Sequence, residues 1–232
     1  MIFHRRAILR MALKMSALGF ASLLPSPVRA MVKPGMRSIT GDVRINGVAA
    51  QMDMLVNPGD TVTTGPGAQA TLVSGFNAYL IRGDGEIEFP EDNTTEEVLR
   101  VVSGQIVSVF GPGELTIDTP LATIGIRGTG AYVEVWQERN YVCLCYGEAQ
   151  LLPKLDPHYA ENLKTTHHEG PRNFYAKPKE HGGKVIEPAD MVNHTDEELI
   201  LLESLVGRIP MFGPKPIKMP KKDGKGGYSI TK

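Results

Sequence analysis

The 232-residue chain has few of the residue types on which several common protein classes depend. Its two cysteines exclude a framework of several disulfides. One tryptophan, in an aromatic content of 6%, is too little for the exposed rings on which sugar-binding modules usually rely. A net charge of −1 excludes a global field that would draw in nucleic acid. The motifs of nucleotide loops, serine-hydrolase elbows and zinc peptidases are also missing, so we expect a non-enzymatic protein.

Long apolar runs are missing as well, and the run near the start of the chain marks a leader. Residues 15–24 make up about half the ~20 residues that a membrane-spanning helix needs. They follow Arg5-Arg6, which resembles a twin-arginine signal, and they precede Val28 and Ala30, which are small enough for a cleavage site. We expect a signal peptide at residues 1–30 and a bacterial periplasmic or secreted mature protein without a stable membrane span. An uncleaved membrane anchor is the alternative.

Turn residues recur about every ten positions through the first two thirds of the mature chain. Between them lie short runs rich in apolar and β-branched residues, such as Tyr79–Ile81 and Leu115–Ile117, and no helix-period pattern interrupts them. This spacing predicts an all-β domain at residues 31–152, solenoid-like or sandwich-like, although no strict sequence repeat accompanies it. The turn signals are Gly47, Pro58-Gly59, Gly65–Gly67, Gly83–Gly85, Gly104, Gly111–Gly113 and Gly147.

Beyond the predicted β domain the composition changes. Several prolines divide a polar stretch, which we expect to cross the β domain as an irregular arm within residues 153–212. One helix is predicted there, because Thr195 and Glu198 form a capping box, an apolar stripe at helical spacing follows, and Gly207 suits the helix end. The stripe is expected to pack on the β domain; an exposed helix for a partner is the alternative. Residues 213–232 predict a basic, disordered tail.

The segment Thr119–Val135 carries the strongest pattern in the chain. Its apolar residues alternate, and Gly128 and Gly130 indicate a bulge or sharp bend before a second run of strand-forming residues. The order TP-x-A-x-I-x-I-RGT-x-x-Y-V-x-V resembles the core of FecR-type domains, envelope domains named after a regulator of ferric citrate uptake. The resemblance extends over residues 41–152 and includes the turn at Pro58–Gly65.

This resemblance implies a β-rich domain, a protein partner in the cell envelope and a link to iron. FecR regulators join such a domain to a cytoplasmic anti-sigma segment through a membrane helix, and this chain has no room for that segment before Gly41. We therefore expect a stand-alone, exported FecR-like domain that works as a binding or interaction protein. The exposed sheet edges of such a domain are natural docking sites for a strand of another protein.

The two cysteines and the downstream histidines form the candidate metal site. Cys143 and Cys145 lie in one predicted strand, where a period of two places both thiols on the same face. On that geometry their Cβ atoms lie roughly 6–7 Å apart, too far for a relaxed disulfide. If the arm folds over this strand, the adjacent His167 and His168 complete a soft site suited to iron, zinc or copper. A twin-arginine leader fits such a site, since that route carries proteins that fold before export, often around a cofactor.

Other interpretations of these residues stay open. The cysteines can be two small buried side chains beside solvated loop histidines, or they can take part in a strained or intermolecular disulfide, which an oxidising compartment permits. The C-x-C and His-His pairs are not part of the FecR pattern. For the whole protein, the alternatives are an exported redox or electron-transfer protein that holds iron, an iron–sulfur unit or haem, and an envelope module that binds polysaccharide.

Overall fold

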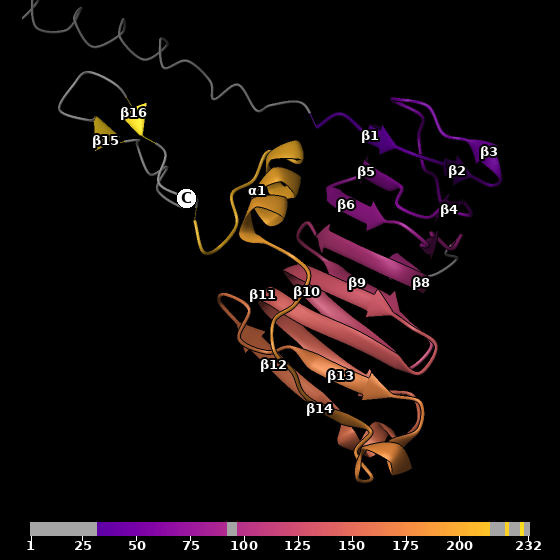
Figure 1. Cartoon of the computed structure of the whole chain (residues 1–232), viewed down its shortest axis with the longest axis vertical. Coiled ribbons are helices and arrows are strands. Elements are labelled where there is room, and N and C mark those ends of the chain that lie inside the picture. The colour runs from indigo at the N-terminus through magenta and orange to yellow at the C-terminus, as the bar shows by residue number, and fades with distance from the viewer. Residues whose placement is uncertain (1–31, 92–96, 214–220, 223–227, 230–232) are drawn as a thin grey trace, which may run out of the picture. The chain divides into compact units, whose positions relative to one another are not determined.

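The computed structural model describes residues 32–91 and 97–213, together with two short strands further on (Figure 1). Those two strands, β15 (Lys221–Lys222) and β16 (Tyr228–Ser229), pair with each other in antiparallel fashion. The leader expected at residues 1–30 lies outside the described residues, and so does most of the predicted tail.

Within the described residues, fourteen strands form one open, mixed sheet, which confirms the all-β prediction. Its main path runs β14-β13-β11-β10-β9-β8-β7-β4-β2-β3, and β8 and β9 form its one parallel pair. The strands are β1 (Gly35–Thr40), β2 (Val43–Ile45), β3 (Val48–Ala49), β4 (Thr61–Thr64), β5 (Gln69–Ser74), β6 (Asn77–Arg82), β7 (Glu86–Glu88), β8 (Glu97–Val109), β9 (Glu114–Asp118), β10 (Ala122–Val135), β11 (Arg139–Pro153), β12 (Glu161–Thr165), β13 (Arg172–Tyr175) and β14 (Ile186–Pro188).

Three of these strands are long and bent at glycines, and here the predicted turns at Gly104 and Gly147 were wrong. Gly104 has φ +86° inside β8, and Gly147 has φ +100° inside β11. A positive φ at one residue bends a strand without reversing it, because the residues on either side keep their partners. In β10 the register shifts between Arg127 and Ala131, around Gly128, which confirms the predicted bulge. Because of these bends, a single strand can pair with different neighbouring strands along its length.

The two faces of the sheet bury different apolar clusters. Along β11, Val142 and Leu144 belong to the larger cluster, whereas Cys143 and Cys145 belong to the smaller one on the opposite face. The smaller cluster is covered by the helix α1 (Asp196–Leu205), which lies beside β6 and β8 (Figure 1). The predicted strand periodicity therefore places both cysteines under the helix and not in the main core.

The predicted helix forms where the sequence indicated. Thr195 is its N-cap and accepts from the backbone N–H of Glu198, whose side chain accepts in return from the N–H of Thr195. Leu199 and Leu202 are fully buried against the sheet, so the helix packs on the β domain as expected. Gly207 has φ +69° just after the helix end. Within the described ranges, no helix has the length and apolar character that crossing a membrane requires.

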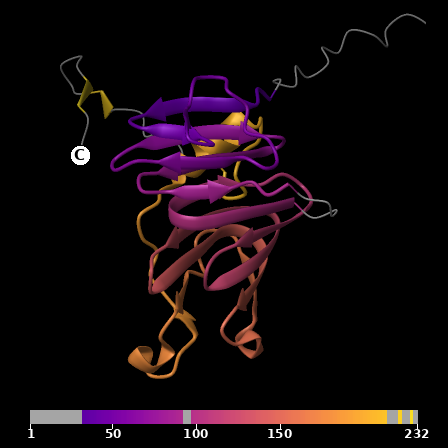
Figure 2. The same cartoon turned by 90° about the vertical axis from the view of Figure 1, so that its right-hand side faces the viewer.

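The arm contains more regular structure than the irregular path we expected. Its strands β12 and β13 pair with the two ends of β11, and β14 pairs with β13. Its short 3-10 turns, η1 (Pro157–Tyr159) and η2 (Pro178–His181), lie in two projections at one end of the sheet (Figure 2). The unpaired edge of β11, a strand with many backbone donors and acceptors, explains why the arm adds strands there. The loops at 166–171 and 189–195 return to the sheet near its cysteines.

Candidate metal centre

The structure brings three of the four predicted metal ligands together and adds one that the sequence analysis missed. Cys143, Cys145, His168 and His194 each offer a ligand atom, and these four atoms lie within 4.8 Å of one another. His167, by contrast, contacts Asp196 on the outer side of the group. One sequence feature could have drawn attention to His194. It stands directly before the capping box, and that box fixes where the chain enters α1.

Both cysteines are buried free thiols on the helix-covered face of β11. Each has an exposed fraction of 0%, and the backbone carbonyl of Cys143 lies 3.7 Å from the sulfur of Cys145. The sulfur of Cys143 lies 3.6 Å from Nδ1 of His168. The prediction that the two thiols share a face is therefore confirmed, and the arm does fold over their strand.

His168 is held in a conformation that few non-glycine residues adopt. Its φ is +57°, and its backbone N–H donates to the carbonyl of Cys145 over 2.8 Å. Backbone strain of this kind persists only where the surroundings enforce it, and it concentrates at functional sites. Nε2 of His168 lies 3.0 Å from a carboxylate oxygen of Asp196, so this nitrogen carries the proton and donates it. Nδ1, on the other side of the ring, is the nitrogen that faces Cys143.

The ring of His194 is fixed in a similar way. Its Nδ1 lies 2.7 Å from the carbonyl oxygen of Val192, which can only accept, so Nδ1 is the protonated nitrogen. Its Nε2 lies 3.0 Å from Nδ1 of His168. The ring also stacks on Tyr132, with ring centroids 4.5 Å apart. Hydrogen bonds on the far nitrogens of both imidazoles therefore aim their near nitrogens at the same space, as outer partners do in metal sites.

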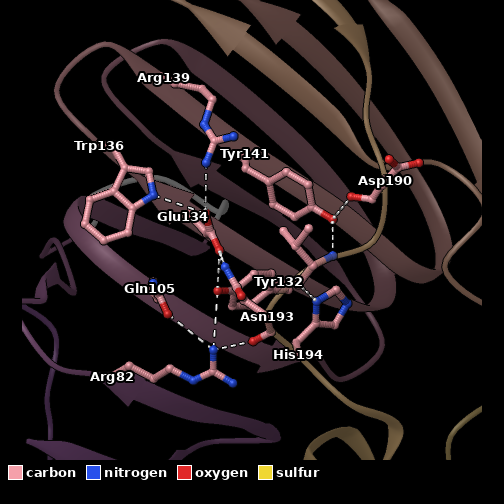
Figure 3. A network of polar contacts seen from close by, with 11 residues as sticks. Arg82, Gln105, Tyr132, Glu134, Trp136, Arg139, Tyr141, Asp190, Asn193 and His194 are labelled. Carbon is pink, nitrogen blue, oxygen red and sulfur yellow. Dashed lines mark hydrogen bonds and ion pairs between the residues drawn. The ribbon is translucent and has the colours of Figure 1, made fainter. Parts of the chain in front are cut away.

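A buried polar network holds the segment that carries His194 (Figure 3). The carboxylate of Glu134, 1% exposed, accepts from the hydroxyl of Tyr132 and from the side-chain amide of Asn193, each over 2.7 Å. It also accepts from Trp136 and Arg139. A fully satisfied network of this kind fixes its members in one arrangement. The position of His194 is thereby set by residues of β10 and β11.

Further contacts tie the same segment to the sheet, and those of Tyr141 with Asp190 and of Arg82 with Asn193 are drawn in Figure 3. The hydroxyl of Tyr141 donates to the carbonyl of Asp190 over 3.0 Å. Arg82 donates to the carbonyl of Asn193, and it forms a 2.6 Å ion pair with Glu198 of α1. The approach to His194 and the helix after it are therefore held without help from the cysteines.

The electrostatics of the group favour a thiolate at Cys143. A hydrogen bond from Cys145 lowers the pKa of Cys143 more than burial raises it, and hydrogen bonds from His168 and His194 lower it further. Burial, and then the hydrogen bond and charge of Cys143, raise the pKa of Cys145. Burial lowers the pKa of His168, but the hydrogen bonds and charges of Cys143 and Asp196 outweigh it, so that pKa is raised overall. The group thus prefers a cation beside an anionic sulfur.

The donor set and its spacing match a tetrahedral metal site. Two sulfurs and two imidazole nitrogens are the ligands of many structural zinc sites. Bonds of about 2.3 Å to sulfur and about 2.05 Å to nitrogen place adjacent S and N ligands about 3.6 Å apart, and two N ligands about 3.3 Å apart. The S–N distance from Cys143 to His168 is 3.6 Å, and the N–N distance from His168 to His194 is 3.0 Å. Small side-chain shifts would bring the four atoms to bonding distance of one ion.

A cysteine, histidine and aspartate in this order also occur in nucleophilic catalysis. Cys143 offers the sulfur, His168 the imidazole and Asp196 the carboxylate that orients it. Cys143, however, is fully buried beneath the arm and α1. A substrate would reach its sulfur only after the arm had moved, so the arrangement serves a small ion better than a substrate.

Comparisons with known proteins give the chain no family. No protein-family model matches it, and no curated protein matches it. Two crystal structures, at 1.65 and 2.50 Å resolution, of a protein described as "a putative anti-sigma factor" from Parabacteroides distasonis are similar to it, each with 10% sequence identity. Their TM-scores are 0.47 and 0.46, and each alignment covers 62% of this chain and 64% of that chain. The geometry of the candidate metal centre carries the functional argument instead.

Proposed function

We propose that this chain is an exported, non-enzymatic binding protein that holds one transition-metal dication at Cys143, Cys145, His168 and His194. The observation that carries this proposal is the 3.0 Å approach of Nε2 of His194 to Nδ1 of His168. The other nitrogen of each ring already donates a proton, so when both rings are neutral, two lone pairs face each other. Lone pairs at this distance repel unless a cation lies between them.

Two cations can meet this need, a proton or a metal dication, and the dication is the one that uses all four donors. In the metal-free chain, a proton on His168 beside the thiolate of Cys143 suffices. A dication uses both thiolates and both neutral imidazoles, and the sum of the charges is zero. A neutral centre is the form that a fully buried position accepts at least cost. Four protein ligands with no open position are typical of structural sites, and zinc and ferrous iron both suit these donors.

The metal would join three segments of the fold. Its ligands come from β11, from the loop at 166–171 and from the segment at 189–195 that leads into α1. The site therefore stabilises a surface made of the arm and α1, and we propose that this surface serves a protein partner in the cell envelope. The twin-arginine-like leader and the FecR-like pattern of Thr119–Val135 support export, a FecR-like role and a link to iron.

Metal analysis of the protein purified from the exported fraction tests this proposal. We expect one zinc or iron ion per chain, and none in the double variant Cys143→Ser with Cys145→Ser. His158→Ala is the matched control, because the side chain of His158 is 96% exposed and should not affect the metal. An absorption spectrum separates colourless zinc from coloured iron–thiolate. Trace metal that the double variant leaves unchanged would refute the site.

A further inference from the structure

We propose that His167 and Asp196 form an outer cation site that loads the buried centre through His168; this inference rests on the proposed function. The outer group consists of His167, His168 and Asp196, and its ligand atoms also lie within 4.8 Å of one another. Nε2 of His167 lies 2.8 Å from the same carboxylate oxygen that lies 3.0 Å from Nε2 of His168. A carboxylate and imidazoles suit a partly hydrated dication.

The two groups share one imidazole. Nε2 of His168 faces the outer group, and Nδ1 of the same ring faces Cys143 and His194. An ion held on the outer side therefore needs to pass only from one edge of this ring to the other. Both edges of the ring are already in position, so the same imidazole contacts the outer group and the buried one.

Exposure distinguishes the two groups and gives the transfer its direction. The side chain of His167 is 46% exposed, whereas those of His168 and Asp196 are each 6% exposed. The cysteines behind them are fully buried. The ring of Phe212 lies against His167, with centroids 4.7 Å apart, and its centroid lies 6.4 Å from that of His168. His167 is thus the member of the two groups that arriving ions meet first.

The transfer is ligand exchange, without oxidation or reduction. A hydrated dication would first bind Nε2 of His167 and the carboxylate of Asp196, and the proton of their hydrogen bond would pass to solvent or to Nδ1 of His167. It would then release its water ligands, His167 and the carboxylate of Asp196 in exchange for the sulfurs of Cys143 and Cys145 and the imidazoles of His168 and His194. The thiol proton of Cys145 and the proton on Nδ1 of His168 would pass to solvent as the two sulfurs and this nitrogen bind. His168 ends with Nδ1 on the metal and with Nε2–H bonded to Asp196, the arrangement in which metal-bound histidines are commonly held.

Stopped-flow loading of the metal-free full chain with Co²⁺ tests this route, since cobalt–thiolate absorbance reports arrival at the cysteines. We expect His167→Ala to slow loading severalfold, because the variant lacks the half-exposed imidazole that arriving ions meet first. Release to a chelator should slow by the same factor, so the affinity and the final spectrum stay those of the wild type. His158→Ala should load at the wild-type rate.

Three other outcomes decide against the inference in distinguishable ways. An unchanged loading rate in His167→Ala would overturn the outer site and leave the buried centre intact. If His167→Ala lowered the affinity for the metal as well as the loading rate, His167 would be a ligand of the bound ion. That result would overturn its role in loading. A wild-type chain that shows no cobalt–thiolate absorbance would refute the proposed function itself, and the loading route with it.

Discussion

Chelation of the bound metal is expected to lower the midpoint of thermal unfolding by roughly 8–16 °C. An ion that binds only the folded chain adds about 4 kcal/mol when its free concentration is 1,000 times Kd. For a domain of this size, each kcal/mol shifts the midpoint by about 2–4 °C. The ligands come from three separate segments of the chain, so the unfolded chain cannot hold the ion in the same way. Calorimetry at fixed free metal, with and without chelator, measures the shift.

The variant His194→Ala supplies the control for that experiment. It removes one ligand and leaves both cysteines, so its unfolding midpoint should respond little to added metal or chelator. His158→Ala should respond as the wild type does. If the wild-type midpoint stayed constant while its metal was shown to be gone, the ion would not hold the arm and α1 to the sheet.

Glu134→Ala is expected to destabilise the folded chain by about 1–3 kcal/mol, the cost of leaving a buried hydrogen-bond donor without its acceptor. Its loss leaves the hydroxyl of Tyr132 and the amide of Asn193 without their acceptor. Because Asn193 precedes His194, the affinity for metal should fall as well. Denaturant unfolding of the full chain measures the first effect. A cost below about 1 kcal/mol would mean that the network is dispensable.

Glu138→Ala is the matched control, since Glu138 is a half-exposed carboxylate that pairs with Lys177. Its cost should stay within about 0.5 kcal/mol. Acid provides a second check on Glu134. Burial raises its pKa, but hydrogen bonds from Asn193, Tyr132 and Trp136 and the charge of Arg139 lower it more, to below 4.5 overall. The stabilisation by its charge is therefore complete above pH 4.5 and is lost as the pH falls through the lowered pKa.

The sequence predicts only those parts of the metal centre whose geometry is set by residues close together in the chain. A period of two in a strand places Cys143 and Cys145 on one face whatever covers it. The two adjacent histidines could not be told apart in this way. The φ of +57° at His168 turns its ring inward while His167 stays at the surface, and no residue pattern around them indicates that conformation.

His194 escaped prediction for a different reason. It follows the cysteines by about fifty residues, and it reaches them only because Tyr141 and Glu134 bind the segment before it. Such long-range contacts leave no periodic signal in the sequence. The helix after it was predictable, because the capping box of Thr195 and Glu198 is a local pattern.

The same contrast applies to the sheet. The alternation and the bulge of β10 follow from its own residues, including Gly128. Gly104 and Gly147 carried the same composition signal as true turns, but the neighbouring strands continue the pairing on both sides of them. The strands of the arm likewise form because β11 offers them an unpaired edge. Nothing in the sequence of the arm itself indicates that edge.

X-ray absorption at the metal edge of the metal-loaded protein tests the central claim most directly. We predict two sulfur neighbours at about 2.3 Å and two nitrogen neighbours at about 2.0–2.1 Å, with imidazole scattering behind them. A first shell of oxygen and nitrogen alone would show that the ion is not bound by Cys143 and Cys145, and would contradict the account.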